Sequence, residues 1–553
     1  MGLVKTSTWT GYLSSSASMG SLMNENGNER DDLRIDVERV GPGTETIDEV
    51  RRASLEHPSV RERLRGKRNR LLSVQLLEPS GTGKADEPEE PDRYRATIYD
   101  YDDNRVLVAS GRLDDQESVE VSQAGYQPLP TGEEFDEAVE ILLEDEDLGP
   151  KIREQHLVPY PPMPPLIDAE LPDGRVERTI AVGLMPQGNG ARHEIVGANM
   201  IHRSVMRFPE RAPETAMAAA AVCGLPRANQ PTAARGTPGQ FRVTVDRGGT
   251  RLWRFLVVRP ADSSGTNGSG VELRGVNYRG KRVLFRAHAP ILNVRYDNDA
   301  CGPFRDWSWQ ESRIQATGAD VAPGIRRSPT PAQTILESGT DTGNFLGVAI
   351  YRAGKETVVV SEMEAGWYRY ISEWRLHNDG TIRPRFGFSA VRNACVCNRH
   401  HHHVYWRFDF DIGTAENNAV REFNSPPIFP GDNWHTFQFE AKRRRRPQQS
   451  RRWQVRNTQT NDAYHLIPGA DDGTADDFGR GDVWILRFRE GEIDDGAVAV
   501  GPPFRADLDR FVNGEDVSNG DVVVWYAAHF THDVGQQEED HRYVGPVLRP
   551  AQW

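Results

Sequence analysis

The chain has 553 residues, 37% of them hydrophobic, with 51 glycines and 36 prolines, a balance that favours strands and turns over helical bundles. It carries 67 Lys and Arg against 81 Asp and Glu, a formal net charge of −14, which argues against a nucleic-acid partner or an acidic membrane surface. A cationic ligand would be attracted instead, and the length allows roughly two to four domains.

No stretch reaches the ~20 apolar residues of a membrane span, and the N-terminus lacks the basic-then-apolar order of a secretion signal. We therefore expect a cytoplasmic protein with no membrane partner. The four cysteines, at 223, 301, 395 and 397, are too few for a disulfide framework in so long a chain. Because Cys395 and Cys397 lie close to a histidine run, a thiolate-containing metal site is an alternative, and it would favour zinc or Cu(I).

The composition and the pattern of apolar residues divide the first 229 residues into three segments. Residues 1–38 are rich in Ser, Gly and Asn and are predicted to form a disordered tail. The segments 39–125 and 126–229 look like a weak internal repeat, in which a helical pattern is followed by short strand-like runs. Each is predicted to be a small α/β domain, with one helix packed on an antiparallel sheet.

From residue 230 to residue 553 the pattern changes to short alternating runs separated by turns. Many short strands over more than 300 residues indicate a large antiparallel β-sandwich, whose edge loops would carry the chemistry. The predicted fold class is thus mainly β, with two small α/β domains before the sandwich. The basic run 442–446, with Arg451 and Arg452 beyond it, is interpreted as a solvated hairpin loop because no aromatic residues interleave it.

Four consecutive histidines, 400–403, lead into an alternating segment that ends at residue 412. In a strand, successive side chains point to opposite faces, so His400 and His402 fall on the apolar side and His401 and His403 on the other. Two imidazoles one residue apart can bind one metal ion, and copper or zinc suits imidazole. A surface histidine cluster is the alternative interpretation.

Other motifs follow one another in order along the predicted sandwich. They are the segments 275–286, 292–296, 304–306, 365–371 and 522–532. With the histidine run they resemble the copper amine oxidases, whose active members carry a topaquinone made from one of their own tyrosines. The resemblance covers nearly the whole chain, since that family has small α/β units before a large β-sandwich.

The resemblance implies a copper site made of His400, His402 and His532. The family's His-x-His pair precedes a strand reading Arg-x-Asp-x-Asp, and residues 407–411 match that strand. This alignment chooses the same pair as the alternation of the strand. His529 is the neighbouring alternative to His532.

A second, calcium-like site of some family members uses two aspartates after the His-x-His pair and one before the last histidine motif. Asp409, Asp411 and Asp521 match these positions. Carboxylates suit a hard cation such as calcium.

Tyr368 is similar to the tyrosine that becomes the quinone in the family. Two neighbours depart from the family pattern, because Trp367 replaces an asparagine and Arg369 replaces an acidic residue. Both positions flank the cofactor, so these departures affect whether Tyr368 is oxidised.

Two further catalytic roles are implied by the resemblance. Tyr296 matches the tyrosine whose hydroxyl orients the quinone. Asp306 matches the aspartate that takes a proton from the substrate, although Trp-Ser-Trp at 307–309 replaces the family's glycines. Asp297 and Asp299 are alternatives to Asp306 as the general base.

The implied function is copper-dependent oxidative deamination of a primary amine by dioxygen, which yields an aldehyde, ammonia and hydrogen peroxide. The family resemblance also implies a homodimer. One alternative is a catalytically silent homologue that acts as a metal-binding or scaffold protein. Another is a copper enzyme that works without a quinone.

Overall fold

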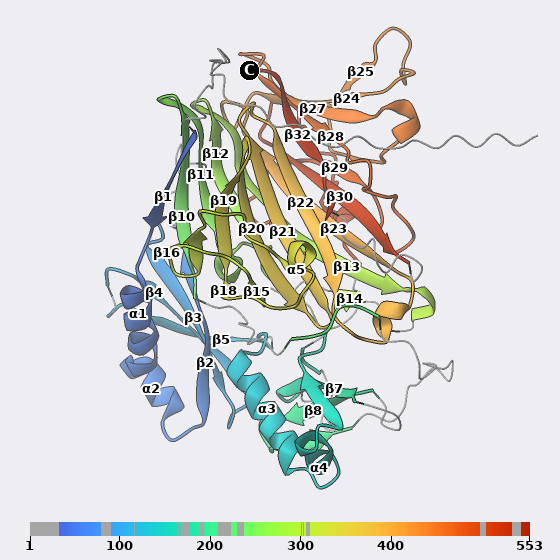
Figure 1. Ribbon diagram of the computed structural model, residues 1–553. Helices are drawn as coiled ribbons and strands as arrows, with labels where there is room; N and C mark the ends of the chain where they lie inside the picture. The colour runs from blue at the N-terminus through green and yellow to red at the C-terminus, as the bar shows by residue number, and fades with distance from the viewer. Residues whose placement is uncertain are drawn as a thin grey trace, which may run out of the picture.

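Two large sheets account for most of the structure, and two small α/β units lie at one end of them (Figure 1). The computed structural model describes residues 33–78, 84, 90–115, 117–125, 127–163, 165–167, 176–187, 193–207, 223–228, 237–299, 301, 304–305, 310–497, 505–533 and 543–553. Among these residues, no helix is both long and apolar enough to span a membrane.

The first large sheet has ten strands and is antiparallel throughout. Its spatial order is β1 (Leu33–Val40), β10 (Gln240–Arg247), β11 (Thr250–Val258), β12 (Glu272–Tyr278), β13 (Lys281–Tyr296), β23 (His400–Phe410), β30 (Val522–His532), β29 (Val483–Arg487) and β26 (Ala441–Arg443), with β14 (Phe304–Arg305) beside β13. The long neighbours β13, β23 and β30 form its centre.

The second large sheet has twelve strands and is antiparallel except where β17 meets β19. Its order is β16 (Ala319–Ala322), β17 (Ile325–Arg327), β19 (Val348–Ala353), β20 (Glu356–Ala365), β21 (Tyr368–His377), β22 (Ile382–Ala390), β32 (Val547–Gln552), β28 (Ala463–Ile467), β27 (Arg452–Asn457), β24 (Asn418–Phe423) and β25 (Trp434–Thr436), with β31 (Tyr543–Val544) on β22. A short helix, α5 (Ile335–Ser338), and the strand pair β15 (Arg313–Ile314) and β18 (Phe345–Leu346) lie beside this sheet.

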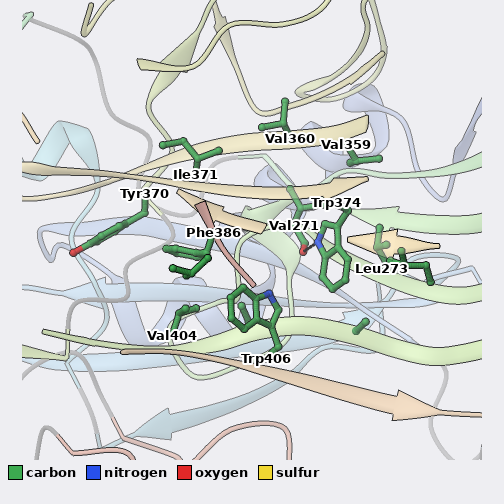
Figure 2. Close-up of a cluster of buried hydrophobic side chains, with 14 of the residues drawn as sticks. Val271, Leu273, Val359, Val360, Tyr370, Ile371, Trp374, Phe386, Val404 and Trp406 are labelled. Carbon is green, nitrogen blue, oxygen red and sulfur yellow. Dashed lines mark hydrogen bonds between the residues drawn. The ribbon is translucent and has the colours of Figure 1, made fainter. Parts of the chain in front are cut away.

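Buried aromatic side chains fill the space between the two sheets (Figure 2). Trp406 of β23 meets Phe386 of β22 edge to face, with ring centroids 6.4 Å apart. Trp374 of β21 donates its indole N–H to the carbonyl oxygen of Val271 at 2.9 Å, so its one polar atom is satisfied in the core. The even-numbered residues of β23 therefore face the second sheet, as the sequence alternation predicts.

Each small unit pairs helices with a four-stranded antiparallel sheet. The first contains α1 (Thr44–Glu56), α2 (Pro58–Leu64), β2 (Asn69–Leu77), β3 (Arg93–Asp100), β4 (Arg105–Arg112) and β5 (Glu120–Ala124). The second contains α3 (Gly132–Glu144), α4 (Leu148–Arg153), β6 (Leu157–Tyr160), β7 (Thr179–Pro186), β8 (Glu194–Asn199) and β9 (Ser204–Met206). The predicted fold class is confirmed, although each unit has two helices where one was expected.

The predicted disordered tail is wrong at its end. Residues Leu33–Val40 form β1, which pairs with β10 from Leu33 opposite Arg247 to Val40 opposite Gln240. Leu33, Ile35 and Val37 alternate with polar residues, a strand signal that the Ser-rich composition around it hides. Residues 1–32 lie outside the described part of the chain. The boundary predicted at 39 falls within β1 and is also wrong, whereas the boundaries at 126 and 230 stay a prediction.

The basic run is not the solvated loop that was expected. Arg443 lies in β26 and donates two hydrogen bonds to Glu422, at 2.7 and 2.8 Å. Arg445 is 9% exposed and donates to Tyr526 at 2.9 Å. These long arginine side chains reach partners that are distant in the sequence. A run of basic residues does not by itself show where such partners lie.

Candidate functional site

The central strands of the first sheet bring three of the predicted histidines together. In the antiparallel pair of β23 and β30, His400 lies directly opposite His532. His402 is two residues further along β23 and so shares the face of His400. The ring centroids are 5.0 Å apart for His400 and His402 and 4.7 Å apart for His400 and His532, and all three side chains are buried.

Tyr368 reaches these histidines from the opposite sheet. It is the first residue of β21, and its buried hydroxyl lies within hydrogen-bonding distance of His400 Nε2 and 2.5 Å from His532 Nδ1. Its ring centroid is 4.5 Å from that of His402. The structure therefore brings the Tyr368 phenol and three imidazoles together in the buried space between the sheets.

Burial favours the neutral form of two of these imidazoles, those of His400 and His402. Burial, with the neighbouring His532 as a smaller cause, lowers the pKa of His400 to about 3, and burial holds the pKa of His402 well below its ordinary value. His400 Nδ1 lies 2.6 Å from the carbonyl oxygen of Asn398, so Nδ1 carries the proton and Nε2 presents its lone pair to Tyr368.

His402 Nε2 is buried and has no hydrogen-bond partner among the described residues. A buried nitrogen without a partner is costly, and a transition metal would satisfy it. The donor set thus fits copper. Among the described residues, the ligand atoms of the three histidines are less closely grouped than the carboxylates of Asp409, Asp411 and Asp521. The Tyr368 hydroxyl lies within hydrogen-bonding distance of both His400 and His532.

The alternative third histidine faces the other way. His529 opposes His403 across the ladder, their Nδ1 atoms are 2.9 Å apart, and His529 Nε2 lies 3.1 Å from Asp482. This pair is on the face of β23 that points away from Tyr368. His401 also lies on that face, where its Nδ1 is 3.0 Å from the hydroxyl of Thr531.

Trp367, one of the departures from the family pattern, contacts Tyr296. Its indole N–H donates to the Tyr296 hydroxyl at 2.8 Å. Tyr296 in turn stacks on the ring of His400, with centroids 4.4 Å apart and planes at 25°. Trp367 therefore fixes a phenol that lies against a candidate copper ligand.

Arg369, the other departure, points away from the Tyr368 ring. Its guanidinium donates to both carboxylate oxygens of Asp341, at 2.8 and 3.0 Å, and lies 3.2 Å from Glu364. These groups are all buried, so the positive charge is neutralised on the far side of β21. Asp341 could not be found from the sequence, because it lies in a loop with no periodic pattern.

Of the three candidate general bases, the structure describes the side chain of Asp297. Asp306 and the side chain of Asp299 lie outside the described residues. Asp297 is about half exposed and lies 3.5 Å from His401 Nε2, on the face of β23 opposite to Tyr368. Its position argues against Asp297 as the base.

The four cysteines form two disulfides, Cys223–Cys397 and Cys301–Cys395. The alternative of a thiolate metal site is therefore wrong, and the cysteines, which were expected to be too few for a disulfide framework, are all bridged. Both bridges fix the short 3₁₀ turn Cys395–Cys397, which ends three residues before His400. Disulfides persist in oxidising compartments, which runs against the expected cytoplasmic location.

Comparison with known proteins shows which fold this is. No protein-family model matches the chain, and no curated protein matches it by sequence. A copper-containing benzylamine oxidase from Hansenula polymorpha has a TM-score of 0.56 at 14% identity, over 90% of this chain and 96% of that one. The chain has the copper amine oxidase fold.

Other solved structures agree. An amine oxidase from Aspergillus nidulans matches with a TM-score of 0.54 at 13% identity, over 93% of this chain and 88% of that one. A lysyl oxidase from Pichia pastoris matches with a TM-score of 0.52 at 11% identity, over 87% and 85%. At these identities the likeness establishes the fold, and the activity is argued from the site.

Proposed function

We propose that the protein is a copper-dependent oxidase that converts a primary amine to an aldehyde with release of ammonia and hydrogen peroxide, using a quinone made from Tyr368. The observation that carries this proposal is the position of the Tyr368 hydroxyl, buried against His400 and His532 in a chain with the copper amine oxidase fold.

His400, His402 and His532 would hold the copper ion. Bound copper, with dioxygen, would supply the oxidation of the Tyr368 ring and the return of electrons to oxygen in each turnover. The chain contributes neutral imidazoles, which need no deprotonation before they bind a metal. Burial of the site between two sheets keeps water from the reacting ring.

Neighbouring aromatic residues orient the ring of Tyr368. Tyr370 stacks on it with centroids 5.3 Å apart and planes at 8°, and the Tyr370 hydroxyl lies 3.3 Å from His402 Nδ1. Tyr296, held by Trp367, would orient the oxidised ring from the side of His400.

Asp306 remains our candidate for the general base. It follows β14, where Arg305 pairs with Asn293 of β13, three residues before Tyr296. Arg305 is buried and donates to Asp495 at 2.5 Å, so the start of this segment is fixed beside the sheet that carries the histidines. A carboxylate there would accept the proton released from the substrate carbon.

The net charge of −14 favours a cationic amine as substrate. We also propose that the protein is a homodimer, which light scattering at micromolar concentration would detect.

Aerobic loading of the metal-free protein with copper(II) tests the function. We expect visible absorbance from a quinone, one phenylhydrazine adduct per chain on the Tyr368 peptide, and peroxide from a primary amine. Copper binding with an unmodified Tyr368 and no peroxide would instead support the silent, metal-binding homologue. Amine turnover with an unmodified Tyr368 would support a copper enzyme that works without a quinone.

A further inference from the structure

The three aspartates expected to bind calcium already surround a cation that belongs to the protein. Lys84 Nζ lies 2.5 Å from Asp409 Oδ1 and 2.9 Å from Asp411 Oδ1, and it also donates to Asp521. An ammonium has three donor hydrogens, and here each has a carboxylate acceptor. The Lys84 side chain is 7% exposed.

Aromatic rings complete the surroundings of this ammonium. Lys84 Nζ lies 4.1 Å from the ring centroid of Phe488 and 5.2 Å from that of Phe285. The face of a phenyl ring attracts an ammonium but cannot ligate calcium, which takes six to eight oxygen ligands. The site therefore suits a lysine better than a divalent ion.

Charge balance leads to the same conclusion. Besides Lys84, Arg407 lies 3.3 Å from Asp409 and Arg282 lies 3.7 Å from Asp411. The three carboxylates thus face three cationic side chains, and the cluster is formally neutral. A divalent ion would gain no net attraction and would have to displace a fully bonded ammonium.

The lysine comes from a different part of the molecule from the aspartates. Lys84 follows β2 of the first small unit, whereas Asp409 and Asp411 are at the end of β23 and Asp521 precedes β30. A second contact joins the same regions, because Glu78, just after β2, pairs with Arg274 and Arg286 of the large sheet.

We propose that Lys84 is a built-in cation that replaces the second, calcium-like ion in this chain and joins the first small unit to the sheet that carries the histidines. This assignment is independent of whether Tyr368 is oxidised.

The first experiment measures thermal unfolding of the full chain in calcium-depleted buffer and in millimolar calcium, with the copper content held the same in both. The wild type should have the same Tm in both. Lys84→Ala should lower the Tm in calcium-depleted buffer by about 3–4 °C, since it leaves buried carboxylates without their cation in a chain of this length. Calcium should restore part of that loss, because the variant has a net negative cluster with space for an ion.

Lys151→Ala is the matched control. Lys151 also bonds an aspartate, Asp147, at 2.6 Å, but this pair is on the surface, with the lysine 45% exposed. Its replacement should leave the Tm nearly unchanged in both conditions. A wild-type Tm that rises with calcium, a Lys84→Ala protein as stable as the wild type, or one that calcium does not stabilise would each overturn the proposal.

A second experiment uses only the wild type, so it holds even where Lys84→Ala does not fold. Brief acylation with an excess of acetic anhydride, followed by peptide mapping, reports the reactivity of each lysine. Lys84 should react at least about tenfold more slowly than Lys151, because its ammonium is buried and bonded to three carboxylates. Equal reactivity of the two lysines would refute the built-in cation.

Discussion

The two ends of the ladder formed by β23 and β30 carry opposite chemistry. At one end His400, His402 and His532 are buried, and burial holds the pKa of His400 and of His402 below its ordinary value. His402 Nε2 has no hydrogen-bond partner among the described residues. At the other end Asp409 and Asp521 are ion-paired to Lys84. The strands are each eleven residues long, so these ends lie roughly 30 Å apart.

This difference shows how each kind of ligand tolerates burial. An imidazole can lose its proton and remain in the core as a neutral base that is ready for a metal. A buried carboxylate that stays ionised needs a counter-charge as soon as the chain folds, and here another segment of the chain provides it. The histidine end should therefore control chemistry, and the aspartate end should control stability.

Among the variants that test the difference between the histidine end and the aspartate end, Tyr368→Phe should have the largest effect. Without the phenol oxygen no quinone can form, so visible absorbance, the phenylhydrazine adduct and peroxide production should all be lost. The Tm should change little, because the ring still packs between the sheets. Tyr464→Phe is the matched control, since this buried hydroxyl donates to the Gly380 carbonyl oxygen beyond the other end of β21 and its loss should leave the cofactor in place. Quinone formation in Tyr368→Phe would place the cofactor on another residue.

His402→Ala should lower the affinity for copper by more than about 100-fold, since losing a ligand costs more than losing a ligand's hydrogen-bond partner. Elemental analysis after dialysis measures this. His401→Ala, on the opposite face of β23, should keep its copper. If His402→Ala kept its copper and His401→Ala lost it, the metal ligands would instead lie on the opposite face of β23.

Asp409→Ala should act on stability alone. It removes the partner of both Lys84 and Arg407 and should destabilise the fold by about 3–5 kcal/mol while copper binding persists. Asp320→Ala breaks a surface pair with Arg326 and should cost less than about 1 kcal/mol. Loss of copper in Asp409→Ala at a temperature where the variant is folded would show that the two ends are coupled.

Trp367→Phe should give the smallest effect. It removes the hydrogen bond to Tyr296, worth about 1 kcal/mol, and keeps the aromatic packing. Because Tyr296 lies against His400, we expect kcat to fall severalfold with the copper content unchanged. An unchanged kcat would remove Tyr296 from the proposed orienting role.

The sequence by itself was enough for the fold class and for the convergence of several side chains. Strand alternation places His400 and His402 on one face, because the period of a strand is a local property of the chain. The resemblance to the copper amine oxidases adds His532 and Tyr368. The same order grouped Asp409, Asp411 and Asp521. The roles of these residues in catalysis remain proposals.

Only the tertiary structure determined which side chains contact the predicted site residues and their neighbours. Lys84 is more than 300 positions from Asp409, and Asp341 reaches Arg369 from a loop without a periodic pattern. The pairing of Cys395 with Cys301 likewise depends on how distant segments meet. A counter-charge or a disulfide partner is chosen by proximity in the folded chain, which the spacing of residues along the sequence does not encode.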